Sequence, residues 1–376
     1  MDEIYLVVLK VLVAFFAAGI LSFVLTPPVK RLAHRIGAID VPKDGRRMHT
    51  RPIPRLGGLA IYLSFVIVSL LMVEWNVQNF TILLGSAIIV FLGIFDDRKA
   101  LGAKFKFGIQ LLAAAIPVIF GNLRIELITN PNLLSDKLYL NFGVFSIPIT
   151  IIWIVAITNA VNLLDGLDGL AVGVSAIACM TMLAVSLLIG EVPIAIVLAI
   201  LAGACVGFMP FNLNPASIFM GDTGSTFLGF MLATLSIQGM FKVYAIISFA
   251  VPFLILGLPI FDTAFAFTRR ILSGRSPFSP DRGHVHHRLI DMGFNQKQTV
   301  AILYIISTIL GLLAVVLTTS GELRAIIMVL AVLVTVIVGS MIYLSMEKRK
   351  MKMHERQMRE EMNKEEQTKT DSDEKP

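Results

Sequence analysis

The chain has 376 residues, of which 56% are hydrophobic and only 15% are charged, and its mean hydropathy is +0.80. This composition excludes a soluble globular domain and predicts an integral membrane protein. A net charge of +6 would suit a nucleic-acid-binding protein, but the basic residues are concentrated in loops between apolar runs, so nucleic acid is not an expected partner. The two cysteines lie inside apolar runs and lack the spacing of a disulfide framework or a metal site.

Eleven apolar runs of roughly 15–25 residues predict membrane-spanning helices, and hence an all-α polytopic membrane protein. The runs are Ile4–Leu25, Gly57–Val73, Phe80–Phe95, Phe107–Phe120, Gly143–Thr158, Leu170–Ile189, Pro193–Met209, Thr226–Met240, Tyr244–Phe267, Val300–Leu317 and Ala325–Met346. The ninth run contains Pro252, Gly257 and Pro259, which predict a kinked or broken helix. Between the fourth and fifth runs, Asn130-Pro-Asn and the alternation over Leu138–Phe145 predict a small hairpin.

Basic residues are distributed very unevenly between the two sets of loops. Of the 32 lysines and arginines, 27 lie in residues 29–55, 98–106, 269–297 and 348–375. This bias places these loops and the C-terminus in the cytoplasm and the N-terminus outside, as in a multi-pass plasma-membrane protein. Residues 1–346 are expected to form a transmembrane catalytic domain, and residues 347–376 a charged, partly disordered cytoplasmic tail.

Two amides and two carboxylates recur every third residue after the fifth run. They are Asn159, Asn162, Asp165 and Asp168. On a helix each step turns by about 60°, so the four would form a slanting stripe. The intervening glycines weaken the helix and let a ligand come close. A solvated loop with Asp-Gly turns is the alternative, but clustered ionisable groups at a membrane-helix end favour a functional site.

Carboxylates also stand at the ends of two other runs on the same predicted face. Asp96 and Asp97 close the third run and can share a cation, although a simple surface turn is the alternative. Gly221-Asp222-Thr-Gly-Ser opens the eighth run, where backbone N–H groups suit an anion and Asp222 suits a hard cation. This segment lacks the lysine of a P-loop, and Asp222 could instead be an ordinary helix cap.

Basic side chains complete this face. Residues 45–58 carry arginines suited to phosphates, although positive-inside anchoring explains most of them. Three of the six histidines, His284, His286 and His287, stand beside Arg282 and Arg288 without zinc-protease spacing. A pH-dependent surface loop is one interpretation, but binding of phosphate oxygens fits better.

Carboxylates, amides and basic groups at cytoplasmic helix ends predict phosphoryl transfer to a lipid. A cation-coupled transporter, the alternative from another class, would need ionisable groups near mid-span.

The sequence closely resembles the polyprenyl-phosphate N-acetylhexosamine-1-phosphate transferases. It is most similar to the bacterial undecaprenyl-phosphate GlcNAc-1-phosphate transferases that start wall teichoic acid, O-antigen and related glycans. The resemblance covers roughly residues 1–345. The motifs that carry it are Asp96-Asp97, Asn159-Ala-Val-Asn162-Leu-Leu-Asp165-Gly-Leu-Asp168-Gly-Leu-Ala, Phe219-Met-Gly-Asp222-Thr-Gly-Ser and His284-Val-His286-His287.

The resemblance implies the reaction and its participants. UDP-GlcNAc binds from the cytoplasm, an oxygen of undecaprenyl phosphate attacks the β-phosphorus, and UMP leaves. The sister branch, which uses UDP-MurNAc-pentapeptide, has three consecutive histidines, whereas Val285 interrupts the run here and favours the GlcNAc donor. The resemblance also implies a Mg²⁺ or Mn²⁺ cofactor. The oligomeric state stays open, with a homodimer as one alternative.

The same resemblance assigns roles to individual residues. Asp222 and Asn162 would bind the metal ion. Asp168 would contact the uracil, with Phe219 stacking on it and Asp165 and Asn159 nearby. Either Asp96 or Asp97 would act on the lipid phosphate, which Lys104 or Lys106 would reach. Arg282, His284, His286 and His287 would hold the pyrophosphate and the sugar.

Overall fold

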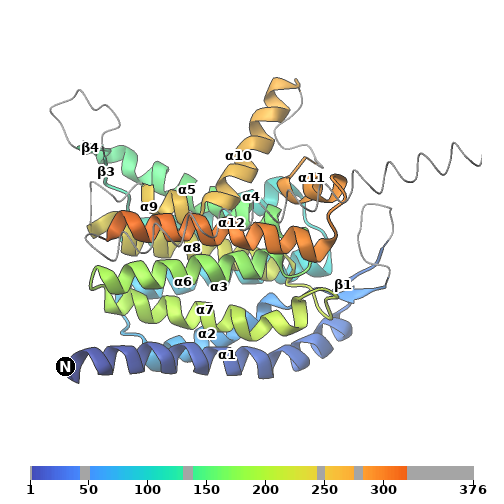
Figure 1. The fold of residues 1–376 in the computed structure, drawn as a ribbon, viewed down its shortest axis with the longest axis horizontal. Coiled ribbons are helices and arrows are strands. Elements are labelled where there is room, and N and C mark those ends of the chain that lie inside the picture. Colours follow the sequence, from blue (N-terminus) through green and yellow to red (C-terminus); the bar gives the residue numbers. More distant parts are fainter. Residues whose placement is uncertain (1, 43–50, 130–138, 244–249, 275–282, 320–376) are drawn as a thin grey trace, which may run out of the picture. The chain divides into compact units, whose positions relative to one another are not determined.

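A computed structural model describes residues 2–42, 51–129, 139–243, 250–274 and 283–319. The eleventh predicted run, the predicted tail and Arg282 lie outside these residues. The described chain forms long helices that run alongside one another, with two short sheets at their ends (Figure 1). The helices are α1 Asp2–Ile36, α2 Gly58–Met72, α3 Val77–Arg98, α4 Ala103–Ile119, α5 Ser146–Leu164, α6 Leu170–Leu188, α7 Val192–Asn212, α8 Gly221–Val243, α9 Ala250–Ile255, α10 Gly257–Leu272, α11 Val285–Asp291 and α12 Gln296–Thr318.

Each of the first ten predicted runs overlaps one of these helices, except the ninth, which overlaps both α9 and α10. Within the described residues, six helices are long and apolar enough to cross a membrane, and α2 is shorter but also apolar. The all-α membrane fold is therefore confirmed, while the number of crossings and the side of each terminus stay predictions. One boundary was wrong: α1 continues to Ile36, through Pro27 and Pro28, because Val29 and Ala33 are buried against the bundle.

The ninth run is broken, as predicted. Helix α9 ends at Ile255, Leu256 leaves helical geometry at φ −94° and ψ 16°, and α10 begins at Gly257. Pro259 lies in the first turn of α10, where the missing N–H costs no hydrogen bond. This proline therefore suits the start of a new helix better than the middle of a continuous one.

Two small antiparallel pairs lie at the helix ends. Strand β1 (Ile39–Asp40) pairs with β2 (Ile53–Pro54) in the register Ile39 to Pro54. Strand β3 (Leu127–Thr129) pairs with β4 (Tyr139–Asn141), which confirms the predicted hairpin; its tip lies outside the described residues. The β2 strand leads directly into the segment before α2, and this placement matters for the site.

Helix α8 lies at the centre of the bundle. It packs against α2, α3, α5 and α6, and its residues from 223 to 237 are buried on every face. Glycines permit this approach: a Cβ at Gly58 would lie 2.0 Å from Gly224 Cα, and one at Gly93 would lie 2.4 Å from Thr223 Cα. The first turn of α8 is thus held against α2 and α3 by direct backbone contact, which fixes where Asp222 stands.

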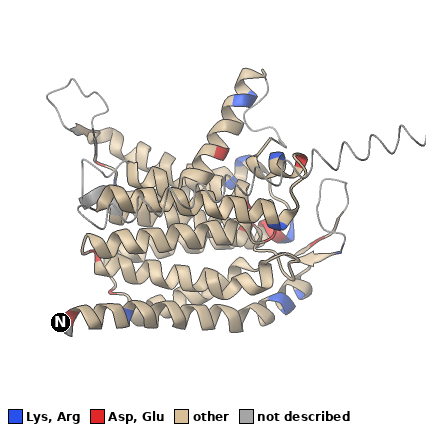
Figure 2. Ribbon diagram, in the orientation of Figure 1, with Lys and Arg blue, Asp and Glu red and all other residues tan. Residues whose placement is uncertain are grey.

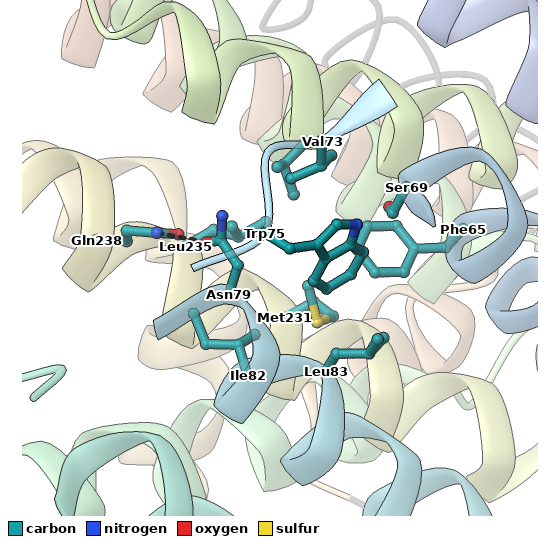
Figure 3. A pocket seen from close by; sticks show the side chains of 11 residues that line it. Phe65, Ser69, Val73, Trp75, Asn79, Ile82, Leu83, Met231, Leu235 and Gln238 are labelled. Carbon is teal, nitrogen blue, oxygen red and sulfur yellow. Dashed lines mark hydrogen bonds between the residues drawn. The ribbon is translucent and has the colours of Figure 1, made fainter. Parts of the chain in front are cut away.

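A pocket is lined by residues of α2, α3, α7 and α8 (Figure 3). It lies near the start of α3 and the end of α8, whereas the predicted site lies at the end of α3 and the start of α8. Most of its lining is apolar, including Phe65, Ile82 and Met231, and the amides of Asn79 and Gln238 stand at its edge. Among the described residues, its lining contains no acidic, basic or histidine side chain. The pocket is therefore separate from the polar cluster described next.

Candidate active site

The charged residues of the described chain gather mainly at one end of the bundle (Figure 2). The end of α3, the start of α8 and the segment between β2 and α2 meet there. Phe219 and Arg55 form a parallel β-bridge: the Phe219 N–H donates to the Pro54 carbonyl at 2.8 Å, and the Phe219 carbonyl accepts from the Gly57 N–H at 2.9 Å. These backbone hydrogen bonds bring Arg55 beside the carboxylates of α3 and α8.

Asp97 holds the first turn of α8 in place. Its carboxylate accepts the N–H of Asp222 at 2.9 Å, the N–H of Thr223 at 3.0 Å and the Thr223 hydroxyl at 2.6 Å. Arg55 Nε donates to the same carboxylate at 3.1 Å. The Asp97 side chain has no exposed surface. It satisfies two of the free N–H groups and the partial positive charge that a helix N-terminus presents, so Asp97 holds the start of α8 by direct contact.

A glycine makes this arrangement sterically accessible. Gly221 has a φ of +73°, and a Cβ there would lie 2.4 Å from Asp97 Oδ2. Both the left-handed backbone and the missing side chain are therefore required, which explains the glycine of the Gly-Asp-Thr-Gly-Ser motif.

Asp222 lies between two cations. Lys106 Nζ is 2.8 Å from Asp222 Oδ2 and 2.9 Å from Asp96 Oδ2, and Arg55 contributes a nitrogen 3.4 Å from Asp222 Oδ1. Asp96 is held further by the N–H of Leu101 at 2.7 Å. The side chains of Asp222, Lys106 and Arg55 are 18%, 26% and 29% exposed, so the cluster is open on this side. Lys104, in contrast, is exposed and has no described contact with the cluster.

Asn162 reaches the same end of α8. Its Oδ1 accepts a hydrogen bond from the Ser225 hydroxyl at 2.8 Å, one turn after Asp222. Within the described residues there is no cluster of three or more acidic, histidine or cysteine side chains that could hold a metal ion by itself. The donors present are hard oxygens on one carboxylate and one amide. They fit Mg²⁺, which typically binds one or two protein carboxylates and takes its other ligands from substrate phosphates and water.

The predicted stripe after the fifth run is helical only in its first half. Helix α5 ends at Leu164, and Gly169 has a φ of +79°, so Asp165 and Asp168 lie in a loop rather than on the helix. The helical interpretation was wrong there because two Asp-Gly pairs favour turns over a continuous helix. Asn159 Nδ2 donates to Gln110 Oε1 at 2.7 Å, which joins α5 to α4.

The two loop carboxylates differ in environment. Burial raises the pKa of Asp165 to about 7, and repulsion by Asp222 adds to the effect. Asp168 Oδ2 accepts hydrogen bonds from Asn214 Nδ2 at 2.9 Å and from the N–H of Ala216 at 3.0 Å. Asp168 thus fixes the segment that leads to Phe219, whose side chain is half-buried.

The histidine segment packs against the loop after α5. A Cβ at Gly166 would lie 2.4 Å from His286 Nε2, so only glycine admits that ring. His286 is 2% exposed, and its Nδ1 has no partner among the described residues. The His287 ring lies 4.3 Å from it, centroid to centroid. His284 Nδ1 is 2.9 Å from Asp262 Oδ2 on α10. The four motifs that were singled out from the sequence are therefore in contact. Asp97 contacts Asp222, the Asn162 segment contacts Ser225, and Gly166 contacts His286.

The pKa of His286 supplies a test of this packing. Burial lowers it to about 4, and the nearby His287 lowers it further. The unfolded chain therefore takes up a proton between about pH 6.5 and pH 4 that the folded chain does not. The free energy of unfolding should fall by up to roughly 3 kcal/mol as the pH drops through this window.

This dependence can be measured by thermal unfolding of the detergent-solubilised chain at several pH values. His286→Gln should make the unfolding temperature less dependent on pH. His34→Gln, at an exposed site on α1, should leave the dependence unchanged; equal slopes in both variants would contradict the assignment.

Comparison with known proteins identifies the family. The sequence profile of glycosyl transferase family 4 matches residues 79–240. A probable undecaprenyl-phosphate N-acetylglucosaminyl 1-phosphate transferase from Bacillus subtilis is 41% identical over 312 residues, which cover 82% of this chain and 85% of that protein. This chain belongs to glycosyl transferase family 4.

Two further known proteins are similar over nearly the same extent. The decaprenyl-phosphate N-acetylglucosaminephosphotransferase of Mycobacterium tuberculosis is 36% identical over 328 residues, covering 77% of this chain and 78% of its own. The undecaprenyl-phosphate α-N-acetylglucosaminyl 1-phosphate transferase of Escherichia coli K12 is 27% identical over 294 residues, covering 76% and 78%. The predicted family and the prediction of a glycosyl-1-phosphate transferase are confirmed, and the transporter alternative is set aside.

Two residues of this family 4 site received no role from the sequence. Arg55 lies in the Pro-x-Pro-Arg-x-Gly-Gly segment before the second run, which positive-inside anchoring does not explain well, but no contact could be assigned to its side chain. Asp262 lies within the ninth apolar run. A lone acid inside an apolar run commonly marks a functional site, so this residue could have been predicted from the sequence.

Proposed function

We propose that this family 4 member transfers GlcNAc-1-phosphate from UDP-GlcNAc to undecaprenyl phosphate, at the cytoplasmic face of the plasma membrane. The observation that carries the proposal is the cluster of Asp96, Asp97 and Asp222 with Arg55 and Lys106, at a charged end of an otherwise apolar bundle. The positive-inside distribution of basic residues supports the cytoplasmic side and the eleven-span topology. The product would begin a cell-wall glycan, for which wall teichoic acid is our first candidate.

The reaction is a displacement at phosphorus. An oxygen of the lipid phosphate forms a bond to the β-phosphorus of UDP-GlcNAc. The bond from that phosphorus to the bridging oxygen breaks, and its electron pair leaves with UMP. The second pKa of a phosphate monoester is near 6, so the acceptor is already largely dianionic at neutral pH and needs little help from a base. Positioning and charge neutralisation are then the main tasks of the protein.

The residues of the cluster can perform both tasks. Lys106 and Arg55 can transfer their hydrogen bonds from Asp222 to phosphate oxygens when the substrates bind. We assign Asp222 and Asn162 to Mg²⁺, which when bound neutralises charge on the diphosphate as the bridge breaks. Asp97 keeps the first turn of α8, and therefore Asp222, in register. Asp96 orients Lys106.

The remaining predicted residues are assigned to the rest of the donor. We place the uracil near Asp168 and Phe219. The hydrogen bonds from Asn214 and Ala216 to Asp168 hold the loop after α5 beside the segment that contains Phe219 and leads into α8. We place the diphosphate and sugar near His284, His286 and His287, together with Arg282. A site that hydrogen-bonds the sugar 3-hydroxyl would reject MurNAc, which carries its lactyl-peptide group there, because the donor in the protein would stay unpaired.

Donor choice tests the proposal. The full chain in lipid nanodiscs receives undecaprenyl phosphate with equal concentrations of UDP-[³H]GlcNAc and UDP-[¹⁴C]MurNAc-pentapeptide. Only the tritium label should appear in the lipid product, because the two donors share the uridine and diphosphate and differ only at the sugar. Equal incorporation of both labels, or a preference for the carbon label, would refute the GlcNAc assignment.

A further inference from the structure

We propose that Asp262 is a positioning residue that fixes the imidazole of His284 with its Nε2 presented to the donor diphosphate. The assignment of what Nε2 contacts rests on the proposed function. The orientation of the ring does not, since it follows from contacts between α10 and the histidine segment alone.

One face of α10 holds the histidine segment. Residues 262, 265 and 269 recur at helical spacing and so lie on the same side of α10. Asp262 Oδ2 lies 2.9 Å from His284 Nδ1, and Asp262 Oδ1 accepts the N–H of Val285 at 2.8 Å. Arg269 donates to the Gly283 carbonyl at 2.9 Å. The Arg288 guanidinium lies 4.8 Å from the centre of the Phe265 ring. Three successive turns of α10 therefore contact residues 283–288 and hold them in place.

The Asp262 carboxylate determines which ring nitrogen carries the proton. An ionised carboxylate only accepts hydrogen bonds, so His284 Nδ1 must be the donor. In the neutral ring Nε2 then has a free lone pair. In the protonated ring Nε2 carries a proton that it can donate to a phosphate oxygen, and Asp262 balances the positive charge. Asp262 and His284 are 3% and 5% exposed, so little water competes for this hydrogen bond.

If Asp262 had a purely structural role, its hydrogen bond from the Val285 N–H would be sufficient to hold the histidine segment. Any acceptor of similar shape could then accept that hydrogen bond. Asparagine separates the two roles. Its Oδ1 can still accept from Val285, but its Nδ2 then points a donor at His284 Nδ1. The proton of the neutral ring should consequently move to Nε2.

The test measures the tautomer and the kinetics separately. The full chain is labelled with ¹⁵N-histidine in nanodiscs, and the His284 signals are assigned by their loss in His284→Gln. Wild-type His284, when neutral, should be protonated at Nδ1, and Asp262→Asn should shift the proton to Nε2. The kcat of sugar-phosphate transfer should fall by about 100-fold with the donor KM within a few-fold. Asp262→Glu, which keeps an acceptor-only group, should recover the Nδ1 tautomer and part of the kcat.

Asp291→Asn, at an exposed site on the same short helix α11, is the matched control and should change neither measurement. A neutral wild-type ring protonated at Nε2 would overturn the proposal without any variant. An Asp262→Asn protein that keeps the wild-type tautomer would also overturn the proposal. The same holds for an Asp262→Asn protein whose loss of kcat is fully explained by a smaller fraction of folded protein. If the wild-type chain transferred no sugar phosphate, the proposed function would fail, while the tautomer measurement would still decide the role of Asp262.

Discussion

Replacing Asp222 with asparagine is expected to lower the rate of sugar-phosphate transfer by at least about 100-fold, the loss typical for a group that neutralises transition-state charge. The substitution removes the carboxylate charge between Lys106 and Arg55 and weakens the proposed metal site. It should keep the fold, because Asp97 binds the backbone N–H of residue 222 and not its side chain. Thermal unfolding of the variant should show only a small fall in the unfolding temperature, from the lost ion pairs with Lys106 and Arg55.

The measurement is initial-rate transfer by purified, folded protein in nanodiscs. Glu74→Gln, an exposed substitution in the segment between α2 and α3, serves as the control and should retain wild-type rates. An Asp222→Asn protein with rates near the wild type would contradict the role of this carboxylate.

Replacing Asp97 with asparagine should harm both stability and activity. Asparagine has one side-chain acceptor oxygen where aspartate has two, and its amide would face the donors of Thr223. It also removes the charge that Arg55 and the start of α8 require. We expect a clear fall in the unfolding temperature together with a loss of activity as large as that of Asp222→Asn.

A graded variant distinguishes positioning from direct chemistry at Asp97. Thr223→Val removes only the hydroxyl donor and should cost about 1 kcal/mol of stability with a modest loss of rate. If Asp97 positions α8, acceptor affinity and stability should fall together across these two variants. An Asp97→Asn protein with wild-type stability and acceptor affinity, but little turnover, would instead indicate that Asp97 acts directly on the substrate.

Sequence patterns predicted the local parts of the fold well. Ten apolar runs located eleven of the described helices, α1 to α10 and α12, and the prolines and glycine of the ninth run predicted its break. Local patterns failed where packing determined the outcome. The pairing of Asp97 with the backbone of Thr223 joins residues 126 positions apart, and it depends on the glycines that let α3 approach α8. No pattern within either segment could predict that pairing.

The candidate site was predictable as a set of motifs but not as a geometry. Asp96, Asp97 and Asp222 were expected to be neighbours, and they are. The choice of Lys106 over Lys104 follows from how α4 is rotated against α3, which the apolar pattern of α4 did not specify. The Pro-x-Pro-Arg-x-Gly-Gly segment set Arg55 apart from the other arginines of its loop, but only the β-bridge with Phe219 places Arg55 beside Asp97 and Asp222.

Metal-dependent transfer by the full chain tests the central claim most directly. Purified protein in nanodiscs is supplied with undecaprenyl phosphate and UDP-[³H]GlcNAc, and both lipid-linked label and UMP are measured. We predict one UMP for each labelled lipid, abolition of both by EDTA, and recovery with Mg²⁺ or Mn²⁺ in the wild type but not in Asp222→Asn. Label transfer that continues undiminished in EDTA, or a full recovery of Asp222→Asn by added metal, would contradict the account.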